Sequence, residues 1–259
     1  MEAEVYTQVK RTIRGLLDIN LEYYKDEQMK RRLDSWLVRS GSASWADYLH
    51  RVRADAGELS RLRDYLTINV SAFFRDPERW QALRQTVLPA LLAGRPRLRV
   101  WSAGCSLGLE PYSLARLLEE VTPARRHTIL GTDLDRGALA KAKARGPYSA
   151  EDVQNVTAQQ RQAFFDPGGP PWYVRTQVAS RVVFREQNML ADDFETDFDL
   201  IVCRNVVIYF TEAAKAQLYQ KFYQALRPGG VLFVGGTEIV PKAQDLGFRN
   251  SGISFYQKA

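Results

Sequence analysis

The sequence predicts an α/β protein with a doubly wound parallel sheet, preceded by a segment built only of helices. Apolar residues recur at helical spacing through about the first 90 residues. From Leu98 onward, short apolar runs alternate with helical stretches, which is typical of a parallel sheet. The first of these runs ends in a loop of small residues. The helix after it has Pro111 near its first turn, where the missing N–H costs nothing.

Residues 1–75 are predicted to form the helical domain. Its apolar positions at helical spacing are Val5, Val9, Ile13, Leu16 and Leu17, followed by Met29, Leu33, Trp36 and Leu37. Ser44 ends a serine-rich turn and is the predicted N-cap of a helix through Val52, and another helix covers about 56–66. Residues 76–97 are a linker helix and loop, which Gly94-Arg95-Pro96-Arg97 closes before the first strand.

The α/β domain is predicted to span residues 98–259. Its expected strands are Arg99–Ser102, Thr128–Thr132, Val182–Glu186, Leu200–Cys203, Val231–Gly235 and Ile253–Gln257. Helices are expected near 112–121, 137–145 and 212–226, the last ending at a Pro-Gly-Gly turn. The long connection after the second strand carries a Pro/Gly-rich turn between short alternating runs. It predicts an inserted β-subdomain at about 150–181, a kind of insertion that more often serves partner recognition than core packing.

Bulk composition excludes several classes of protein. The 259 residues include two cysteines, Cys105 and Cys203, without metal-ligand spacing, and two histidines, His50 and His127. This pattern suits a reducing cytoplasm better than a disulfide framework, and it argues against a histidine triad or a metal site. No apolar run approaches the ~20 residues of a membrane helix, and the N-terminus has no signal-peptide pattern. We therefore expect a cytoplasmic protein that holds no metal and does not insert into membranes.

The net charge of +6 does not by itself indicate a nucleic-acid-binding protein. Residues 1–66 carry 12 Lys or Arg against 11 Asp or Glu, so the excess lies further along the chain. The sequence has no Lys/Arg block of the kind that marks a nucleic-acid arm. The charge indicates only that acidic partners are tolerated or favoured.

Candidate ligand-binding residues follow four of the predicted strands. They are Gly104 and Glu110 after the first strand, Asp133 at the end of the second, Asn188 and Met189 after the third, and Arg204 and Asn205 after the fourth. The carboxyl ends of parallel strands meet at the edge of the sheet where ligands bind. A glycine in the first loop lets a ligand approach the backbone, and the next helix offers free N–H groups.

Other interpretations stand beside these. Asp133 can accept hydrogen bonds from both ribose hydroxyls of a nucleotide, or it can cap the following helix. The ligand role is favoured because Asp135 is better placed as the cap. Asn188 can bind a base edge or satisfy the backbone of its own loop, and neither is favoured. Arg204 at a sheet edge is costly unless it is paired or functional, whereas Tyr209 is as readily a core aromatic.

A further candidate segment joins the two domains. Asn69, Ser71 and Arg75 flank the aromatic pair Phe73-Phe74. Paired aromatics at a junction more often anchor two domains together than line a cofactor site. The polar residues are harder to explain as packing.

Together these segments resemble the CheR family, the chemotaxis receptor glutamate methyltransferases. The resemblance covers nearly the whole chain, in the family's order. Its motifs are Asn69-Val70-Ser71-Ala72-Phe73-Phe74-Arg75-Asp76, Trp101-Ser102-Ala103-Gly104-Cys105-Ser106, Thr132-Asp133-Leu134-Asp135, Gly146-Pro147-Tyr148, Phe198 to Phe210 and Pro228 to Glu238. The string Cys203-Arg204-Asn205 followed by Ile208-Tyr209-Phe210 is too specific for chance agreement.

The resemblance implies a helical N-terminal domain and a class I S-adenosylmethionine (SAM) domain with a small inserted β-subdomain. It implies SAM as cofactor, S-adenosylhomocysteine as its product, and glutamate methyl esters on the cytoplasmic helices of a chemoreceptor. The implied cofactor contacts are Asn69, Ser71, Arg75, Glu110, Asp133, Asn188, Met189, Arg204 and Asn205, and Gly104 lies in the same pocket-forming loop.

This chemistry needs no strong base. A sulfonium methyl is already activated, and a glutamate side chain with pKa about 4.3 is already an anion at neutral pH. The site must align the reacting atoms and exclude water, and Arg204 or Tyr209 is the candidate for positioning the acceptor.

The chain departs from the family pattern at three positions. Val70 stands where the family usually has an acid, and Leu107 and Leu109 replace a hydroxyl residue and one of two adjacent acids. We expect a more apolar pocket that still binds the cofactor. A rival hypothesis follows from the same residues, namely a non-catalytic regulator that binds SAM or S-adenosylhomocysteine.

The partner implied by the family is an acidic receptor helix, which basic residues of the helical domain would steer. These residues are Lys25, Lys30, Arg31, Arg32 and Arg39. The alternative is a solvated helix face, which the charge pattern alone favours slightly. The insertion looks short, so docking of a receptor tail by strand addition is doubtful. We expect a monomer.

Overall fold

The structure is a computed structural model that describes residues 1–67, 69 and 71–259. Its described residues divide into two compact units. The helical unit comprises residues 1–67 together with 208–215, and the α/β unit comprises residue 69, residues 71–207 and residues 216–259. The sequence analysis assigned residues 69–75 to the helical domain. Asn69 and residues 71–75 belong instead to the α/β unit, where Phe73 packs among aromatic residues.

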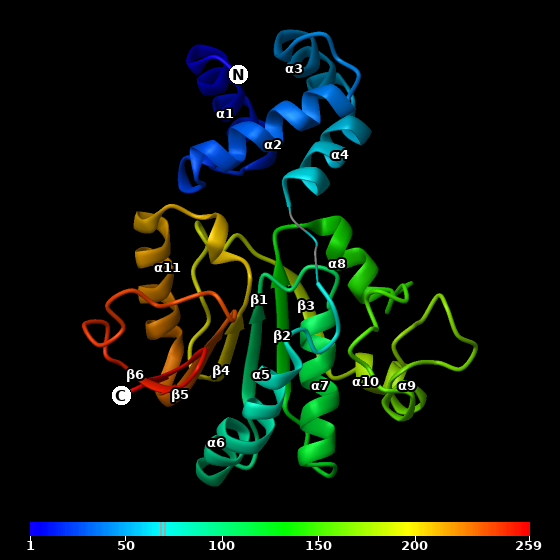
Figure 1. The fold of residues 1–259 in the computed structure, drawn as a ribbon, viewed down its shortest axis with the longest axis vertical. Coiled ribbons are helices and arrows are strands. Elements are labelled where there is room, and N and C mark those ends of the chain that lie inside the picture. The colour runs from blue at the N-terminus through cyan, green and yellow to red at the C-terminus, as the bar shows by residue number, and fades with distance from the viewer. Residues whose placement is uncertain (68, 70) are drawn as a thin grey trace. The chain divides into compact units, whose positions relative to one another are not determined.

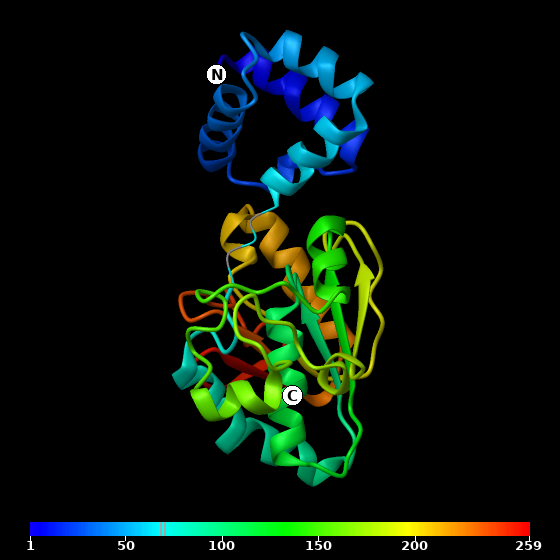
Figure 2. The ribbon, with the colours of Figure 1, turned by 90° about the vertical axis from the view of Figure 1, so that its right-hand side faces the viewer.

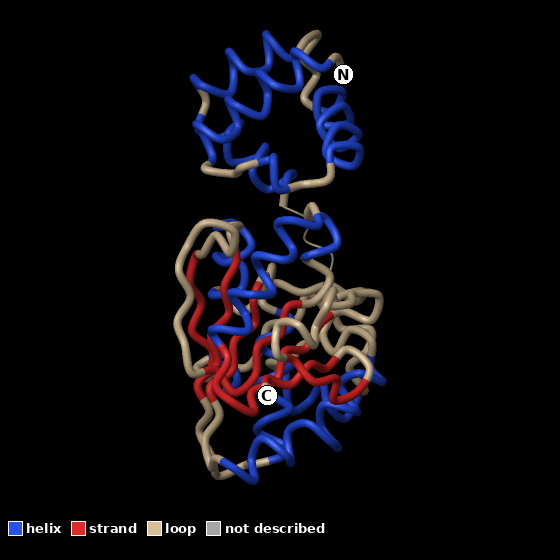
Figure 3. Tube along the Cα trace, turned by 90° about the vertical axis from the view of Figure 1, so that its left-hand side faces the viewer, coloured by secondary structure: helices blue, strands red, loops and turns tan. Residues whose placement is uncertain are grey.

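The helical unit contains the helices that the sequence predicts. They are α1 Ala3–Leu17, the short 3-10 turn η1 Leu21–Tyr23, α2 Asp26–Arg39, α3 Trp45–Ala54 and α4 Ala56–Leu66 (Figures 1 and 3). Val9, Ile13 and Leu33 are fully buried, as their helical spacing predicts. Ser44 caps α3, since its Oγ accepts a hydrogen bond from the Asp47 N–H at 3.2 Å.

A distant segment, residues 208–215, completes the helical unit. The Lys25 N–H donates to the Tyr209 carbonyl at 3.0 Å, and the Thr211 N–H donates to the Tyr23 carbonyl at 2.8 Å. The Tyr24 and Phe210 rings meet edge to face with centroids 5.1 Å apart. The Ile-Tyr-Phe string after the fourth strand thus contributes to the helical unit.

The α/β unit begins with helices and continues as a seven-stranded sheet (Figure 1). Its helices are α5 Pro77–Ala82, the π-helical turn η2 Leu83–Val87, α6 Leu88–Gly94, α7 Leu109–Val121, α8 Arg136–Lys143, α9 Ala158–Phe164 and α10 Thr176–Ala179, with the 3-10 turn η3 Val207–Tyr209 and the helix α11 Glu212–Ala225 spanning the boundary between units. Its strands are β1 Arg99–Ala103, β2 Thr128–Asp133, β3 Val182–Glu186, β4 Phe198–Cys203, β5 Leu226–Val234, β6 Phe248–Gly252 and β7 Phe255–Lys258.

The sheet order is β3-β2-β1-β4-β5-β7-β6, in which β1 to β5 are parallel and β7 pairs antiparallel with both β5 and β6. β3 is an edge strand, drawn as the yellow arrow in Figure 2. The doubly wound parallel sheet is confirmed. Strand β6 was not predicted, because only Phe248 among its five residues is buried and the segment has no apolar run. The predicted helix through 226 ends at Ala225, and β5 starts directly after it.

The two faces of the sheet bury different side chains. Val100 on β1 belongs to a hydrophobic core shared with α7 residues such as Leu114 and Leu118. On the other face, the Trp101 ring contacts Phe198 at 5.3 Å and Phe222 of α11 at 5.5 Å, between ring centroids. This alternation along β1 is what a strand covered on both faces requires.

The insertion at 150–181, all of which the structure describes, is not a β-subdomain. It consists of α9, α10 and loops, with isolated bridges that pair Tyr148 with Trp172 and Phe165 with Val174. Phe164 and Phe165 lie with ring centroids 5.1 and 5.2 Å from Phe73. The expected sheet is wrong because the alternating apolar residues serve core packing, as does the Phe73-Phe74 pair.

Among residues 1–67, 69 and 71–259, no helix is both long and apolar enough to cross a bilayer.

Candidate active site

The loop after β1 meets two other loops at Gly104. This glycine has φ +75°, and its N–H donates to the Thr132 carbonyl at 2.8 Å. A Cβ atom there would lie 2.7 Å from Val206 Cγ2 and 3.4 Å from Met189 Cε. Both the left-handed backbone and the close approach therefore require glycine. The loops after β1, β3 and β4 converge at this point, as the strand-end argument predicts.

A hydrogen-bonded chain links Asn69 to the end of β2. Asn69 Nδ2 donates to Asp135 Oδ2 at 2.6 Å, and the Ser106 hydroxyl donates to Asn69 Oδ1 at 2.6 Å. Asp133 accepts from the Ser106 N–H at 2.7 Å and from the Asp135 N–H at 2.9 Å. Asp135 caps α8 by accepting from the Ala138 N–H at 2.9 Å. The prediction that Asp135 is the helix cap is thus confirmed.

Asp133 and Glu110 are acids held in a buried setting. Burial raises the pKa of Asp133, against the lowering effect of the N–H donors. Burial likewise raises the pKa of Glu110, which the Arg204 charge and the Ser102 hydroxyl oppose. Ser102 Oγ donates to Glu110 Oε1 at 2.7 Å. Both carboxylates are therefore placed where a cationic ligand would stabilise their ionised forms.

Arg204 is buried and paired, as its position at the sheet edge requires. Its Nη2 donates to Asp76 Oδ2 at 2.6 Å and to the Arg75 carbonyl at 2.9 Å, and its Nη1 lies 3.6 Å from Glu110 Oε2. Its Cζ lies 4.8 Å from the centroid of the Phe233 ring. The guanidinium thereby connects the segment after Phe74 to the acid at the start of α7.

The backbone of Asn205 is hydrogen-bonded to Glu238, which is not among the residues predicted from the sequence. Glu238, only 6% exposed, follows β5. Its Oε2 accepts from the Asn205 N–H at 2.9 Å and from the Gly235 N–H at 2.6 Å. An acid just past the carboxyl end of a parallel strand was the available signal, because that end belongs to the ligand-binding edge.

The loop after β3 is fastened from α11. Lys221 Nζ donates to the Met189 carbonyl at 3.1 Å and to the Asp192 carbonyl. Asn188 Oδ1 accepts from the Leu190 N–H at 3.1 Å, so this oxygen serves the loop's own turn. The structure therefore supports the local role that the sequence left open for Asn188.

The remaining candidates are Arg75, Ser71, Tyr209 and the segment around Val70, and Arg75 meets Arg204 through its carbonyl. Arg75 accepts from Trp80 Nε1 at 2.9 Å through its carbonyl, and Ser71 is half-buried. Tyr209 belongs to the helical unit, apart from the unit that contains the other candidates. Val70 lies outside the described residues.

The two leucines of the first loop have a packing explanation. Leu109 is fully buried in the hydrophobic core, and Leu107 packs against the same core. The Leu107 carbonyl also accepts from the Tyr148 hydroxyl at 2.8 Å. These contacts explain both leucines without a more apolar ligand pocket.

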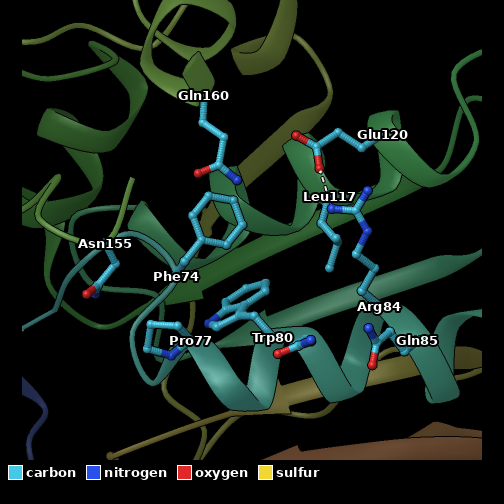
Figure 4. Close-up of a pocket in the computed structure, with 10 residues that line it drawn as sticks. Phe74, Pro77, Trp80, Arg84, Gln85, Leu117, Glu120, Asn155 and Gln160 are labelled. Carbon is cyan, nitrogen blue, oxygen red and sulfur yellow. Dashed lines mark hydrogen bonds and ion pairs between the residues drawn. The ribbon is translucent and has the colours of Figure 1, made fainter. Parts of the chain in front are cut away.

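A separate hollow of about 390 Å³ lies beside Trp80 (Figure 4). Its floor is aromatic and its rim polar, with the lining residues Phe74, Pro77, Trp80, Gln81, Arg84, Gln85, Leu117, Glu120, Asn155 and Gln160. None of the candidate site residues is among these described lining residues. Within the described part of the chain, no cluster of three or more His, Cys, Asp or Glu side chains could hold a metal ion.

The fold and the strand-end site define a class I SAM-dependent methyltransferase. Residues 69–256 match the sequence model of the CheR methyltransferase SAM-binding domain, and residues 4–67 match that of the CheR methyltransferase all-alpha domain. The chain therefore belongs to the CheR family.

Curated relatives agree with this assignment. The chain is 41% identical to the chemotaxis protein methyltransferase of Listeria monocytogenes over 254 residues, which cover 98% of this chain and 97% of the relative. It is 34% identical to chemotaxis protein methyltransferase 1 of Pseudomonas aeruginosa, over 85% of each chain. It is 32% identical to the chemotaxis protein methyltransferase of Escherichia coli, over 90% of this chain and 83% of the relative. The protein is a methyltransferase of chemotaxis with SAM as cofactor.

The residues of the site fit SAM. Glu110 is a buried acid beside which an ammonium group would be stabilised. Asp133 uses its oxygens to accept two N–H bonds, and each oxygen keeps a lone pair for a ribose hydroxyl. Gly104 lets the loops that carry Met189 and Val206 pack closely against the end of β1. SAM supplies the activated methyl group, and these residues would bind and orient it.

Proposed function

We propose that the protein transfers the methyl group of SAM to glutamate side chains on the cytoplasmic helices of a chemoreceptor, forming glutamate methyl esters. The carrying observation is a group of acids at the carboxyl ends of the strands: Asp133 ends β2, and Glu110 and Glu238 both lie within the electrostatic influence of Arg204. Such a site suits a cationic cofactor and an acceptor that needs no proton removed.

The chain's two histidines support an acceptor that is already ionised. His127 Nδ1 accepts from the Leu98 N–H at 3.0 Å, beside the start of β2 and therefore at the opposite edge of the sheet. His50 lies on α3 of the helical unit. A hydroxyl or amine acceptor would call for a general base, whereas a carboxylate at neutral pH does not.

Catalysis by such a site would come from positioning. Sulfonium and carboxylate charges both disappear in the transfer, so a site that excludes water favours the transition state over the separated ions. Arg204 already has three oxygen atoms near its guanidinium, which supports a role in holding Glu110 and the segment at Asp76. Tyr209 and Arg204 are the candidates for orienting the acceptor carboxylate.

The receptor surface would lie on the helical unit. Arg31 and Arg39 of α2 are exposed, although Arg39 also lies over the ring of Tyr65, whereas Lys30 and Arg32 are half-buried over the rings of Tyr6 and Tyr65. Two exposed cations on one helix support electrostatic attraction of an acidic receptor helix. A monomer acting in the cytoplasm, at the receptor's cytoplasmic region, is consistent with this role.

The deciding experiment is transfer of radiolabelled methyl from SAM to a purified receptor cytoplasmic fragment. We expect label that alkali releases as methanol, and receptor glutamates replaced by alanine should remove it. In Arg204→Ala, we expect transfer to fall at least a hundredfold at saturating SAM. Unchanged transfer with intact SAM binding would refute the role of Arg204.

The same assay addresses the rival hypothesis. Tight binding of SAM or S-adenosylhomocysteine together with no alkali-labile label on any receptor fragment would favour a non-catalytic regulator. Label that resists alkali would instead indicate a different acceptor group.

A further inference from the structure

We infer that Glu238 is a positioning residue for this methyl transfer, because its buried carboxylate holds the Arg204-Asn205 turn in the form that the SAM pocket needs. The inference rests on the proposed site roles of Arg204 and Asn205. No contact between Glu238 and SAM or the acceptor is required.

One carboxylate oxygen joins the ends of two neighbouring strands. β4 and β5 are parallel and pair through Cys203 and Val234 at their carboxyl ends. Glu238 Oε2 accepts from the Gly235 N–H just past β5 and from the Asn205 N–H just past β4. The pairing of β4 with β5 ends at Cys203 and Val234, so the hydrogen bonds of the sheet do not connect the two segments that follow.

The backbone around Glu238 is shaped for this contact. Asn205 has φ +59°, a left-handed conformation that costs a non-glycine residue about 1 kcal/mol. A Cβ atom on Gly235 would lie 2.6 Å from Glu238 Oε2 and 3.1 Å from the Asn205 nitrogen. The carboxylate therefore occupies the space that only a glycine leaves free.

Because the contact is buried, losing it should cost free energy of folding. Burial raises the pKa of Glu238, while the N–H donors and Arg204 oppose that rise. Removing the carboxylate would leave two buried N–H groups without their acceptor, at about 1–3 kcal/mol each. The turn would relax, and Arg204 would lose its placement against Glu110 and Asp76.

The first test compares Glu238→Gln with Asp199→Asn. Asp199 is a fully buried carboxylate at the opposite end of β4, where it accepts from the Arg99 N–H at 2.7 Å. Both variants remove the charge of a buried carboxylate that accepts a backbone N–H at one end of β4, and Asp199→Asn also weakens an ion pair with Arg227, so both should lower the melting temperature. We expect a loss of S-adenosylhomocysteine affinity of about tenfold, measured by calorimetry, in Glu238→Gln only.

A second pair of variants disturbs the contact while leaving Glu238 itself unsubstituted. Gly235→Ala would push its methyl group into Glu238 Oε2, whereas a Cβ atom on the neighbouring Gly236 meets nothing within 4 Å. We expect Gly235→Ala to reproduce the loss of affinity and Gly236→Ala to behave as wild type. This pair keeps the test decisive if Glu238→Gln does not fold.

The kinetic readout separates positioning from stability. At saturating SAM, we expect Glu238→Gln to lower kcat for receptor methylation severalfold with little change in KM for the receptor. Equal affinity losses in Glu238→Gln and Asp199→Asn, or wild-type affinity in both Glu238→Gln and Gly235→Ala, would overturn the inference. Because cofactor binding needs no acceptor, these results stand apart from whether the receptor glutamate is the substrate.

Discussion

At the scale of single residues, Glu110 shows how a sequence motif acquires its chemistry from burial. The acid follows Gly104 by six positions and opens α7, where a helix N-terminus favours negative charge. Its carboxylate nevertheless has a raised pKa because it is removed from water. A cofactor ammonium placed beside it would restore the ionised form.

This arrangement predicts a pH dependence of cofactor binding. A raised pKa in the free protein means that Glu110 takes up protons at pH values above its ordinary 4.5. Bound SAM favours the ionised form, so binding releases a proton in that range and affinity falls as the pH is lowered through it. Calorimetry of S-adenosylhomocysteine binding, in buffers of different ionisation enthalpy, measures the released proton.

The matched control is Glu110→Gln. This variant should bind more weakly at neutral pH, by about tenfold or more, and should show a smaller change of affinity on acidification. The same pH-dependent change of affinity in both proteins would show that Glu110 is not the group that titrates. The sign for stability is opposite to that for binding. In the free protein a raised folded-state pKa makes the Glu110 contribution to stability fall as the pH rises through it.

At the scale of elements, the loop after β3 depends on a helix far along the chain. Lys221 of α11 donates to two carbonyls of that loop and lies 4.1 Å from the centroid of the Phe194 ring. Burial lowers the pKa of Lys221. The loop carries Asn188 and Met189, so Lys221 fixes their position.

We predict that Lys221→Met weakens cofactor binding about fivefold. Lys258 is a close structural match, since it donates to the Tyr223 and Leu226 carbonyls at 2.8 and 2.7 Å and lies 4.5 Å from the Tyr223 ring centroid. It supports no candidate site residue. Lys258→Met should therefore lower the melting temperature by a similar amount and leave the affinity unchanged. Equal losses of affinity in Lys221→Met and Lys258→Met would mean that Lys221 affects binding only by stabilising the folded protein.

Some elements could be predicted from the sequence and others could not. The buried strands β1, β2 and β4 were predictable, since each is a continuous apolar run between turn signals. The insertion was misjudged because alternation of apolar residues fits a strand and a core-packing loop equally well. Strand β6 has one buried residue and was therefore invisible to patterning.

At the scale of the whole molecule, the candidate cofactor residues and the basic residues of α2 belong to different units. The α/β unit contains every described candidate for cofactor binding, and the helical unit contains the basic residues of α2. Segment 208–215, which includes Tyr209, follows the Arg204-Asn205 turn after β4 and contributes to the helical unit.

This separation predicts that charge reversal on α2 weakens binding of the receptor and leaves binding of the cofactor unchanged. The double variant Arg31→Glu/Arg39→Glu should raise KM for a receptor fragment severalfold at low salt, with less effect at 0.5 M salt because the charges are screened. Cofactor affinity should not change. Arg53→Glu, an exposed arginine on α3, is the control for a change of charge in the same unit. Equal effects from both variants would place the receptor surface elsewhere.

The sequence by itself determined the helical first domain, the five parallel strands, the convergence of strand-end loops and the family. These properties follow from local patterns of apolar residues, glycines and motifs, which each segment carries on its own. Only the tertiary structure decided that Arg204 pairs with Asp76 and Glu110, that Leu109 belongs to the core, and that Glu238 accepts from the Asn205 N–H. Those facts depend on contacts between residues far apart in the chain, where burial sets the charge and the partner of each group.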